Sequence, residues 1–236
     1  MLLYHHHIPR TSGMQINRQF ESWFKAYPIN FKCISSYDTI EPEEFKDLLY
    51  LSGHLGNLPE LYVADMVSFA IVRNPVDRFI STFKYFYEYF GLPGDQNGFE
   101  IFMSDKKYYE PHSNIQTKSL TGSIDFQSWN KTINTDKVTN GFFYNNFSLS
   151  DSKIKDSIDS KYVTTSNNRQ KLLGFLDNWF YDDFGFKLQN INHIYNNSNN
   201  VKLDISKSMT DKIIELNEKD FIAFEYVKSK EHLPFV

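Results

Sequence analysis

Residues 69–81 read Phe69-Ala70-Ile71-Val72-Arg73-Asn74-Pro75-Val76-Asp77-Arg78-Phe79-Ile80-Ser81. They predict a strand, a turn and a helix in direct succession. Residues 67–72 form a short run that is apolar apart from Ser68, which is typical of a strand buried in a parallel sheet. Pro75 near its start and Gly91 after its end predict a helix over residues 75–90. A parallel sheet with helices on its faces follows from this pattern where it recurs.

This unit also places two anion-binding side chains near each other. Arg73 stands at the end of the strand, and Ser81 lies two turns into the helix. Because arginine grips a phosphate through two parallel N–H groups, we expect Arg73 and Ser81 to hold one phosphate group. The alternative interpretation is a surface salt-bridge cluster of Arg73 and Arg78 with Asp77.

A second strand–loop–helix unit opens the chain. It reads Leu2-Leu3-Tyr4-His5-His6-His7-Ile8-Pro9-Arg10-Thr11-Ser12-Gly13-Met14. We expect a strand over residues 2–8 and a helix over residues 14–27. The N–H groups and dipole at such a helix start attract an anion, and a glycine lets the backbone approach it closely. The residues expected to serve this phosphate site are Arg10, Thr11, Ser12, Gly13 and Met14. The alternative is an ordinary turn with a surface arginine.

The remaining pattern predicts one α/β domain over residues 1–236, with helices on both faces of a central parallel sheet of four or five strands. Further strands are expected over residues 31–36, 48–52 and 162–165, and further helices over 99–103, 169–180 and 210–228. Residues 91–160 are less regular and rich in Asn, Ser, Thr and Lys. We interpret them as a substrate-side insertion rather than a second domain.

The bulk composition limits the kinds of partner and the compartment that we expect for this protein. The 236 residues carry a formal net charge of −4, which argues against a general nucleic-acid-binding protein. No run approaches the roughly 20 apolar residues that span a bilayer. The single cysteine, Cys33, cannot form an intramolecular disulfide, which favours a reducing compartment. We therefore expect a cytoplasmic protein without a membrane span.

The two loops together resemble a known family. His-Ile-Pro-Arg-Thr-Ser-Gly at residues 7–13 is similar to the 5′-phosphosulfate loop of sulfotransferases, H-x-P-K-T-[AG]-[GS]-T-S. Residues 73–81 resemble their 3′-phosphate loop, R-[DN]-P-x-x-R-x-x-S. Between them, Gly53-His54 is similar to a strand end of the heparan sulfate 2-O-sulfotransferase-like branch, and Asn114-Ile115-Gln116-Thr117 resembles its N-x-Q-T element. The resemblance extends to about residue 226.

This resemblance implies a P-loop-kinase-like sulfotransferase fold and a metal-free reaction. The donor would be 3′-phosphoadenosine-5′-phosphosulfate (PAPS), the product PAP, and the acceptor a hydroxyl, which we expect on a carbohydrate. Arg10 would neutralise charge on the bridging oxygen, and backbone N–H groups of residues 11–14 would hold the 5′-phosphate. Arg73 and Ser81 would hold the 3′-phosphate. His54 would take the acceptor proton, a role that suits a group titrating near neutral pH.

Three residues depart from the family pattern. Arg10 replaces the usual lysine, and Met14 and Gln15 replace Thr-Ser, which removes two hydroxyls. Gln15 can supply part of the lost hydrogen bonding. Two alternatives therefore stand beside an active sulfotransferase. One is a non-catalytic or weakly active nucleotide-binding protein of the same fold. The other is a P-loop small-molecule kinase, against which the absence of G-x-x-x-x-G-K-[ST] argues.

Overall fold

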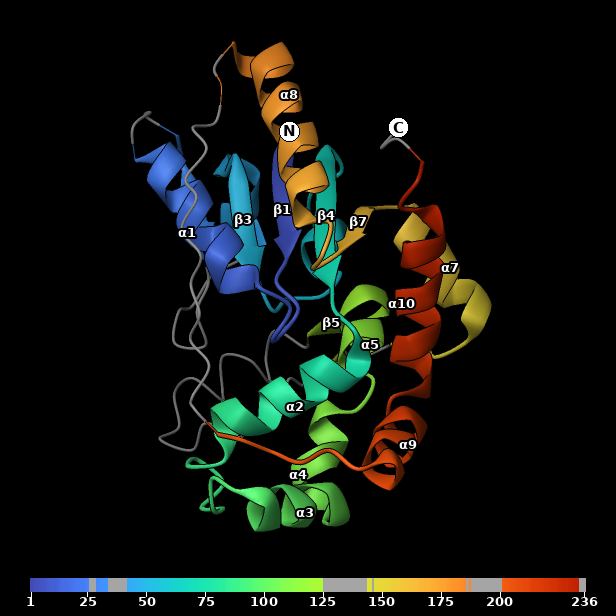
Figure 1. The fold of residues 1–236 in the computed structure, drawn as a ribbon. Coiled ribbons are helices and arrows are strands. Elements are labelled where there is room, and N and C mark those ends of the chain that lie inside the picture. The colour runs from blue at the N-terminus through green and yellow to red at the C-terminus, as the bar shows by residue number, and fades with distance from the viewer. Residues whose placement is uncertain are drawn as a thin grey trace.

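The structure is a computed structural model that describes residues 1–25, 29–33, 42–124, 144–145, 147–185, 187 and 201–233. At its centre lies a five-stranded sheet, ordered β2-β3-β1-β4-β7, in which every neighbouring pair is parallel (Figure 1). The strands are β1 (Leu2–His6), β2 (Phe31–Cys33), β3 (Tyr50–Gly53), β4 (Met66–Val72) and β7 (Tyr162–Thr165). A separate antiparallel pair joins β5 (Ser123–Ile124) to β6 (Tyr144–Asn145).

Helices cover both faces of the sheet. On one face, α1 (Gly13–Phe24) and α8 (Arg169–Phe184) bury a shared aromatic core against the strands. On the other face lie α5 (Ile115–Thr121), α7 (Asp151–Asp159) and α10 (Glu218–Lys230). Short 3₁₀ helices, η1 (Pro42–Asp47) and η2 (Pro59–Leu61), flank β3 in the chain. The result is the three-layer α/β/α arrangement that the sequence predicts.

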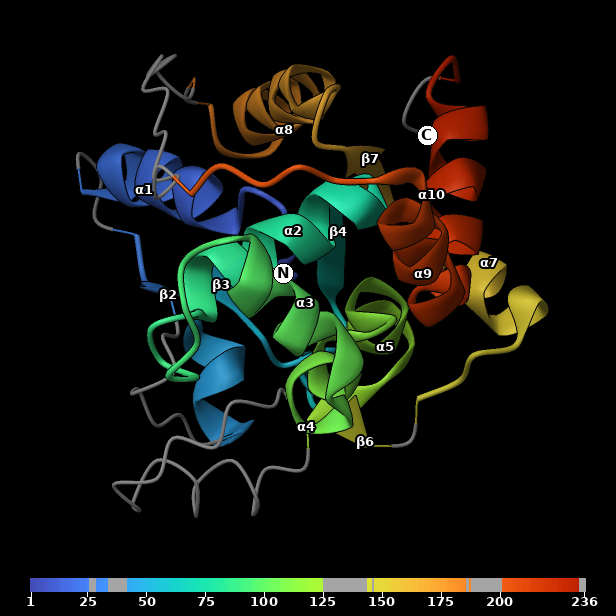
Figure 2. The ribbon, with the colours of Figure 1, turned by 60° about the horizontal axis from the view of Figure 1, so that its bottom comes forward.

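A smaller helical group lies below the sheet in Figure 1 and comes forward in Figure 2. It contains α2 (Pro75–Phe86), α3 (Gln96–Ser104) and α9 (Lys207–Leu216), which share a buried cluster that includes Phe79, Phe83 and Phe102. The short α4 (Lys106–Tyr109) and η3 (Glu110–His112) continue from α3. These helices face the carboxyl edge of the sheet, where the loops after the strands emerge.

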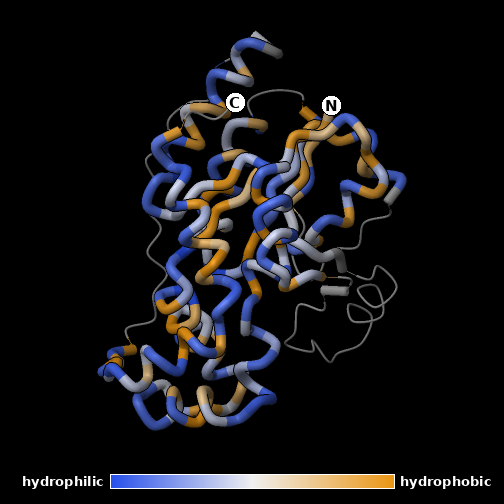
Figure 3. The backbone as a smooth tube through the Cα atoms, turned by 90° about the vertical axis from the view of Figure 1, so that its right-hand side faces the viewer, coloured by the Kyte–Doolittle hydropathy of each residue, from blue (hydrophilic) through white to orange (hydrophobic). Residues whose placement is uncertain are grey.

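The strands follow the alternation that a two-faced sheet requires. Leu3 joins the core beneath α1 and α8, whereas its neighbours Leu2 and Tyr4 face the opposite side. In β4, Phe69 and Ile71 lie in the first core, and Ala70 and Val72 lie in the second. The hydrophobic stretches of these strands run through the middle of the molecule in Figure 3. Burial on both faces explains why every residue of β4 except Ser68 is apolar.

The expected elements agree with the structure at most positions. The predicted parallel α/β sheet is confirmed, and the strand over residues 162–165 and the helix from residue 169 are present. The helix from Pro75 ends at Phe86 rather than residue 90, followed by a turn to Gly91 with a φ of 66°. The predicted ends at residues 26–27 and 34–36 lie outside the described residues. The single-domain prediction and the interpretation of residues 91–160 stay predictions.

One predicted helix is wrong. Residues 210–228 do not form a single helix, because α9 ends at Leu216 and α10 begins at Glu218. Asn217 breaks the helix, with a φ of −128° and a buried side chain. Its Oδ1 accepts a hydrogen bond from Arg78 at 2.9 Å, and its Nδ2 donates to the carbonyl of Ile213 at 2.9 Å. The side-chain contacts of Asn217 thus override its helical surroundings.

Candidate active site

The sheet brings the two predicted loops and His54 to one edge. In the parallel register, His6 at the end of β1 pairs with Gly53 on one side and Ala70 on the other. The residues that follow these strands therefore emerge together at the carboxyl edge, above α2 in Figure 1. Ligands of open α/β sheets bind at this edge. The sequence motifs alone predict that His54, Arg73 and the loop after β1 each lie at the end of a strand.

The loop after β1 holds two residues in the left-handed region. Arg10 has a φ of 66° and Ser12 a φ of 81°. For residues other than glycine this conformation costs about 1–2 kcal/mol each. The carbonyl of Ser12 accepts the N–H groups of Gln15 and Ile16 as α1 begins. The preceding N–H groups, of Gly13 and Met14, have no acceptor within the helix and can serve an anion.

The hydroxyl of Thr11 is engaged within the first loop. It is buried and donates to the carbonyl of Ile8 at 2.9 Å. Because a hydroxyl has one proton, this bond uses its donor to close the loop. In this arrangement the Thr11 side chain therefore has no proton left to donate to a phosphate. Its backbone N–H stays a candidate ligand.

Gly13 is needed where α1 meets the first loop. A Cβ added there would lie 1.8 Å from Cδ2 of His7, a distance that no side-chain atom can occupy. The His7 ring thus packs directly against the start of the helix. This close approach explains on steric grounds why a glycine stands at the last position of the H-x-P-x-T-x-G pattern.

Arg10 connects the two loops. Its Nε and Nη2 donate to the hydroxyl of Ser81 at 3.1 and 3.0 Å. Its guanidinium carbon lies 4.5 Å from the ring centre of Tyr85, one turn further along α2. From the other loop, Nη1 of Arg73 donates to the carbonyl of Arg10 at 3.4 Å. Arg10, Arg73 and Ser81 therefore form one site instead of two.

This site is electropositive. Within the described part of the chain, neither Arg10 nor Arg73 forms an ion pair with a carboxylate. Burial lowers the pKa of Arg10, the phenol of Tyr85 opposes that shift, and the Arg73 cation adds to it. Burial also lowers the pKa of Arg73, with the Asp77 carboxylate opposing. Two half-buried cations without counterions favour a bound anion.

His54 lies beside His7 behind the first loop. Its Nδ1 is hydrogen-bonded to the carbonyl of His7, and the two rings are 4.4 Å apart. Since a carbonyl only accepts, the proton is on Nδ1 and the lone pair is on Nε2. Burial lowers the pKa of His54 to about 4, opposed by the bond to His7. His54 is therefore neutral at pH 7, as a general base must be.

Arg78 does not belong to a surface cluster. Its side chain is fully buried, with Nε 3.5 Å from Oδ2 of Asp220 and Nη2 donating to the carbonyl of His112 at 2.7 Å. The alternative interpretation that grouped Arg73, Arg78 and Asp77 at the surface is thus wrong for Arg78. The second arginine of the R-N-P-V-D-R pattern is structural, since it joins α2 to α10.

Sequence reasoning missed one arginine near the first loop. Nη1 of Arg169 donates to Oε1 of Gln15 at 2.6 Å. Gln15 stands where the family pattern has a hydroxyl, and Arg169 begins α8 directly after the loop that follows β7. An arginine just beyond a predicted strand end, as at Arg73, was the available indication. The pair adds a third cation near the start of α1.

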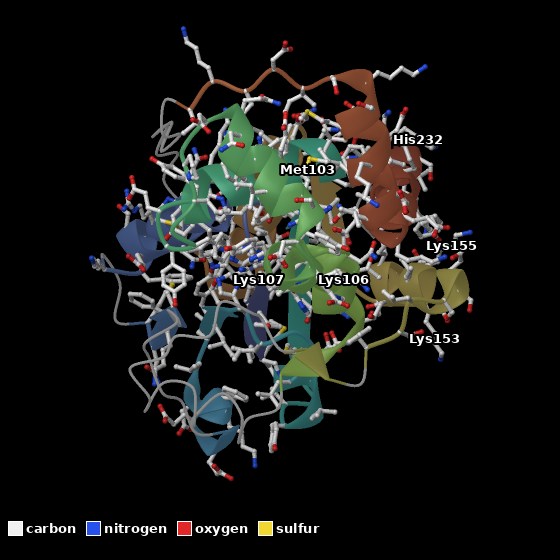
Figure 4. The ribbon with its side chains drawn as sticks, turned by 90° about the horizontal axis from the view of Figure 1, so that it is seen from below. Met103, Lys106, Lys107, Lys153, Lys155 and His232 are labelled. Atoms are coloured by element: carbon white, nitrogen blue, oxygen red, sulfur yellow. The ribbon has the colours of Figure 1, made fainter. Side chains whose placement is uncertain are left out.

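The described residues include neither a three-ligand metal site nor a membrane-spanning helix. They contain no group of three His, Cys, Asp or Glu side chains that could hold a metal ion. Lys106 and Lys107 lie on α4 in the middle of the lower face in Figure 4, whereas Lys153 and Lys155 lie on α7 to one side. Among the helices described, none is both long and apolar enough to cross a membrane.

Comparison with known proteins identifies the wider group. A model of the sulfotransferase family matches residues 42–227. The match includes His54, Arg73 and Ser81 and begins after the loop at residues 7–13. No curated protein matches the chain significantly.

Proposed function

Because the chain belongs to the sulfotransferase family, we propose that it transfers a sulfuryl group from PAPS to a hydroxyl of a carbohydrate and releases PAP. The observation that carries this proposal is the contact of Arg10 with Ser81, beside Arg73. It joins the two loops into one electropositive site. A donor with phosphates on both its 3′ and 5′ positions suits such a site.

The 3′-phosphate is assigned to Arg73 and Ser81. Arg73 supplies a planar pair of donors, and the Ser81 hydroxyl supplies a third. Arg10, which reaches Ser81 here, adds charge on the same side. The 5′-phosphosulfate is assigned to the backbone N–H groups of residues 11–14, where the dipole of α1 also favours negative charge. The Gln15–Arg169 pair supplies polar groups where the hydroxyls of the family pattern are missing.

The proposed step is an in-line displacement at sulfur. The acceptor oxygen forms a bond to sulfur while the bond from sulfur to the phosphate oxygen breaks, and that oxygen leaves with the electron pair on PAP. Nε2 of His54 takes the proton of the acceptor hydroxyl. Arg10 stabilises the charge that develops on the leaving oxygen. A base with a pKa of about 4 is weak, and the anionic donor raises that pKa by favouring the imidazolium.

Exposed aromatic rings support a carbohydrate acceptor. Tyr85 lies in the last turn of α2 and Tyr89 in the turn that follows the helix, and each is 53% exposed. Tyr85 also contacts Arg10, so a molecule bound at the site passes close to its ring. A tyrosine offers an apolar face with a polar tip, which suits the face of a sugar.

Calorimetric titration with adenosine 3′,5′-bisphosphate tests the donor. We expect binding to the wild-type protein and a loss of about ten- to a hundredfold in affinity for Arg73→Ala, because a hydrogen-bonded charge is removed. No binding, or binding untouched by Arg73→Ala, would overturn the proposal. Titration with ATP and Mg²⁺ tests the kinase alternative.

A second candidate function is nucleotide binding without transfer. The observation that favours it is the altered first loop, in which Met14 and Gln15 replace two hydroxyls. Incubation with radiolabelled PAPS and a panel of glycans separates the two functions. Label transferred to a glycan supports the enzyme, and tight binding without transfer supports the binding protein.

A further inference from the structure

The backbone of Arg73 lies just beyond the residues of β4 that pair with neighbouring strands. Pairing of β4 with β1 ends at Ala70, and pairing with β7 ends at Val72. One last bond joins the N–H of Ser166 to the carbonyl of Val72 at 2.7 Å. The N–H and C=O of Arg73 therefore need partners from outside the sheet.

A single side chain supplies both partners. Oε1 of Gln116 accepts the N–H of Arg73 at 2.7 Å, and Nε2 of Gln116 donates to the carbonyl of Arg73 at 2.9 Å. The amide thus pairs with this residue as a neighbouring strand would. A carboxamide offers a donor and an acceptor side by side in one plane. The Gln116 side chain is fully buried, so water does not compete for these bonds.

Gln116 is itself held in place by a buried circuit. Asp220 accepts the N–H groups of Gln116 at 3.3 Å and Thr117 at 2.8 Å. Asp220 is paired with Arg78, which belongs to the same strand–loop–helix unit as Arg73. The contacts run from Arg73 to Gln116, Asp220 and Arg78 and so return to α2. The loop that carries Arg73 is fixed at both ends by α5 and α10.

We propose that Gln116 is a positioning residue, which aims Arg73 at the 3′-phosphate of the donor by holding its backbone; this rests on the function proposed above. Gln116 does not touch the nucleotide in this role. Its effect is therefore confined to ligands that carry a 3′-phosphate. A residue that merely stabilised the fold would affect nucleotides with and without that group alike.

The test compares two ligands. Calorimetric titration gives the affinities for adenosine 3′,5′-bisphosphate and for adenosine 5′-monophosphate, and their ratio measures the preference for the 3′-phosphate. We expect Gln116→Met to lower that ratio by roughly tenfold, as expected for loss of well-made hydrogen bonds. In an Arg73→Ala background, Gln116→Met should lower it no further, because the group that it positions is absent.

A matched variant controls for the loss of a glutamine. Gln96 on α3 also uses its amide to hold a backbone, since its Oε1 accepts the N–H of Asp204 at 3.0 Å. Gln96→Met should leave the ratio unchanged. If Gln116→Met does not fold, Gln116→Asn replaces it, because that amide is too short to reach both groups of Arg73.

The outcomes separate the two proposals. If the wild-type protein shows no preference for the 3′-phosphate, the proposed function fails. If the wild type shows the preference and the Gln116 variants keep it, or lose affinity for both nucleotides equally, only the positioning role is overturned. A lowered ratio in the Gln116 variant alone, with Gln96→Met like wild type, supports the role.

Discussion

The guanidinium of Arg10 and the hydroxyl of Ser81 are joined by two hydrogen bonds, at 3.1 and 3.0 Å. These residues come from different strand–loop–helix units. Their contact therefore requires that both units fold and that β1 and β4 pair in the observed register. It converts two separate sequence patterns into one candidate site.

Removal of this hydroxyl should weaken nucleotide binding. Ser81→Ala deletes a ligand assigned to the 3′-phosphate and the partner that holds Arg10. We expect affinity for adenosine 3′,5′-bisphosphate to fall by about 1.5–3 kcal/mol, the usual range for hydrogen bonds to charged groups. Calorimetry measures the change. Ser104→Ala, at an exposed serine at the end of α3, is the control, and equal losses in the two variants would contradict the assignment.

His54 should affect chemistry more than binding. His54→Ala removes the assigned base, for which general-base catalysis typically supplies 10²–10⁴-fold in rate. We expect kcat for sulfuryl transfer to fall within that range while the Kd for adenosine 3′,5′-bisphosphate changes less than threefold (~0.6 kcal/mol). Single-turnover assays and calorimetry give the two quantities. A variant that retains its rate would remove His54 from the mechanism.

Two glycines should respond in opposite directions to the same substitution. Gly13→Ala forces a Cβ against His7, and overpacking of this kind costs about 1–3 kcal/mol. Gly174→Ala, in α8, meets no atom within 4 Å and should stabilise the helix by about 0.5–1 kcal/mol. Urea denaturation of both variants measures the changes. Destabilisation by both substitutions would show that the His7 contact is not the cause.

Stability should fall in mild acid. Burial lowers the pKa of His5 to about 3, that of His6 to about 4 and that of His112 to about 3, from 6.5. The unfolded chain thus binds more protons below pH 6.5, so acid favours unfolding. Each histidine contributes up to about 1.4 kcal/mol per pH unit between its two pKa values.

The measurement is urea denaturation at pH values from 7.5 to about 4.5. We expect constant stability above about pH 7 and a decline below 6.5. His112→Gln should flatten the decline. His232→Gln, at an exposed histidine near the end of α10, serves as the matched control (Figure 4). A decline that is identical in all three proteins would assign the acid sensitivity elsewhere.

The local sequence predicts most of the fold and the outline of the site. The apolar run before Arg73 and the proline after it mark a strand and a helix without any tertiary information. The positions of Arg73 and Ser81 follow from that unit. The remaining features of the fold and of the site depend on contacts between residues that are distant in the sequence. Arg78 is charged, and its complete burial is tolerable because it pairs with Asp220 and donates to His112 and Asn217.

Two further differences between the sequence-based predictions and the structure also come from contacts between residues that are distant in the sequence. Asn217 lies in a helical pattern, and the break there depends on Arg78, which is remote in sequence. In the sequence, Gln116 is one position of the N-x-Q-T element. Its contact with the backbone of Arg73 follows only from the packing of α5 against the end of β4. Polar residues whose partners are distant in sequence are therefore where the sequence was least informative.

The circuit through Asp220 also sets an order of events during synthesis. Arg73 leaves the ribosome early, but its backbone is secured by α5, and α5 is anchored by a residue synthesised almost 150 positions later. Contacts of such separation form late, because their loop-closure entropy must first be overcome. A nascent chain that already contains Arg10 and Arg73 therefore has an incomplete candidate anion site. Under the proposed function, a nucleotide finds its complete site only after translation has passed residue 220, and its binding then stabilises the complete fold rather than partial chains.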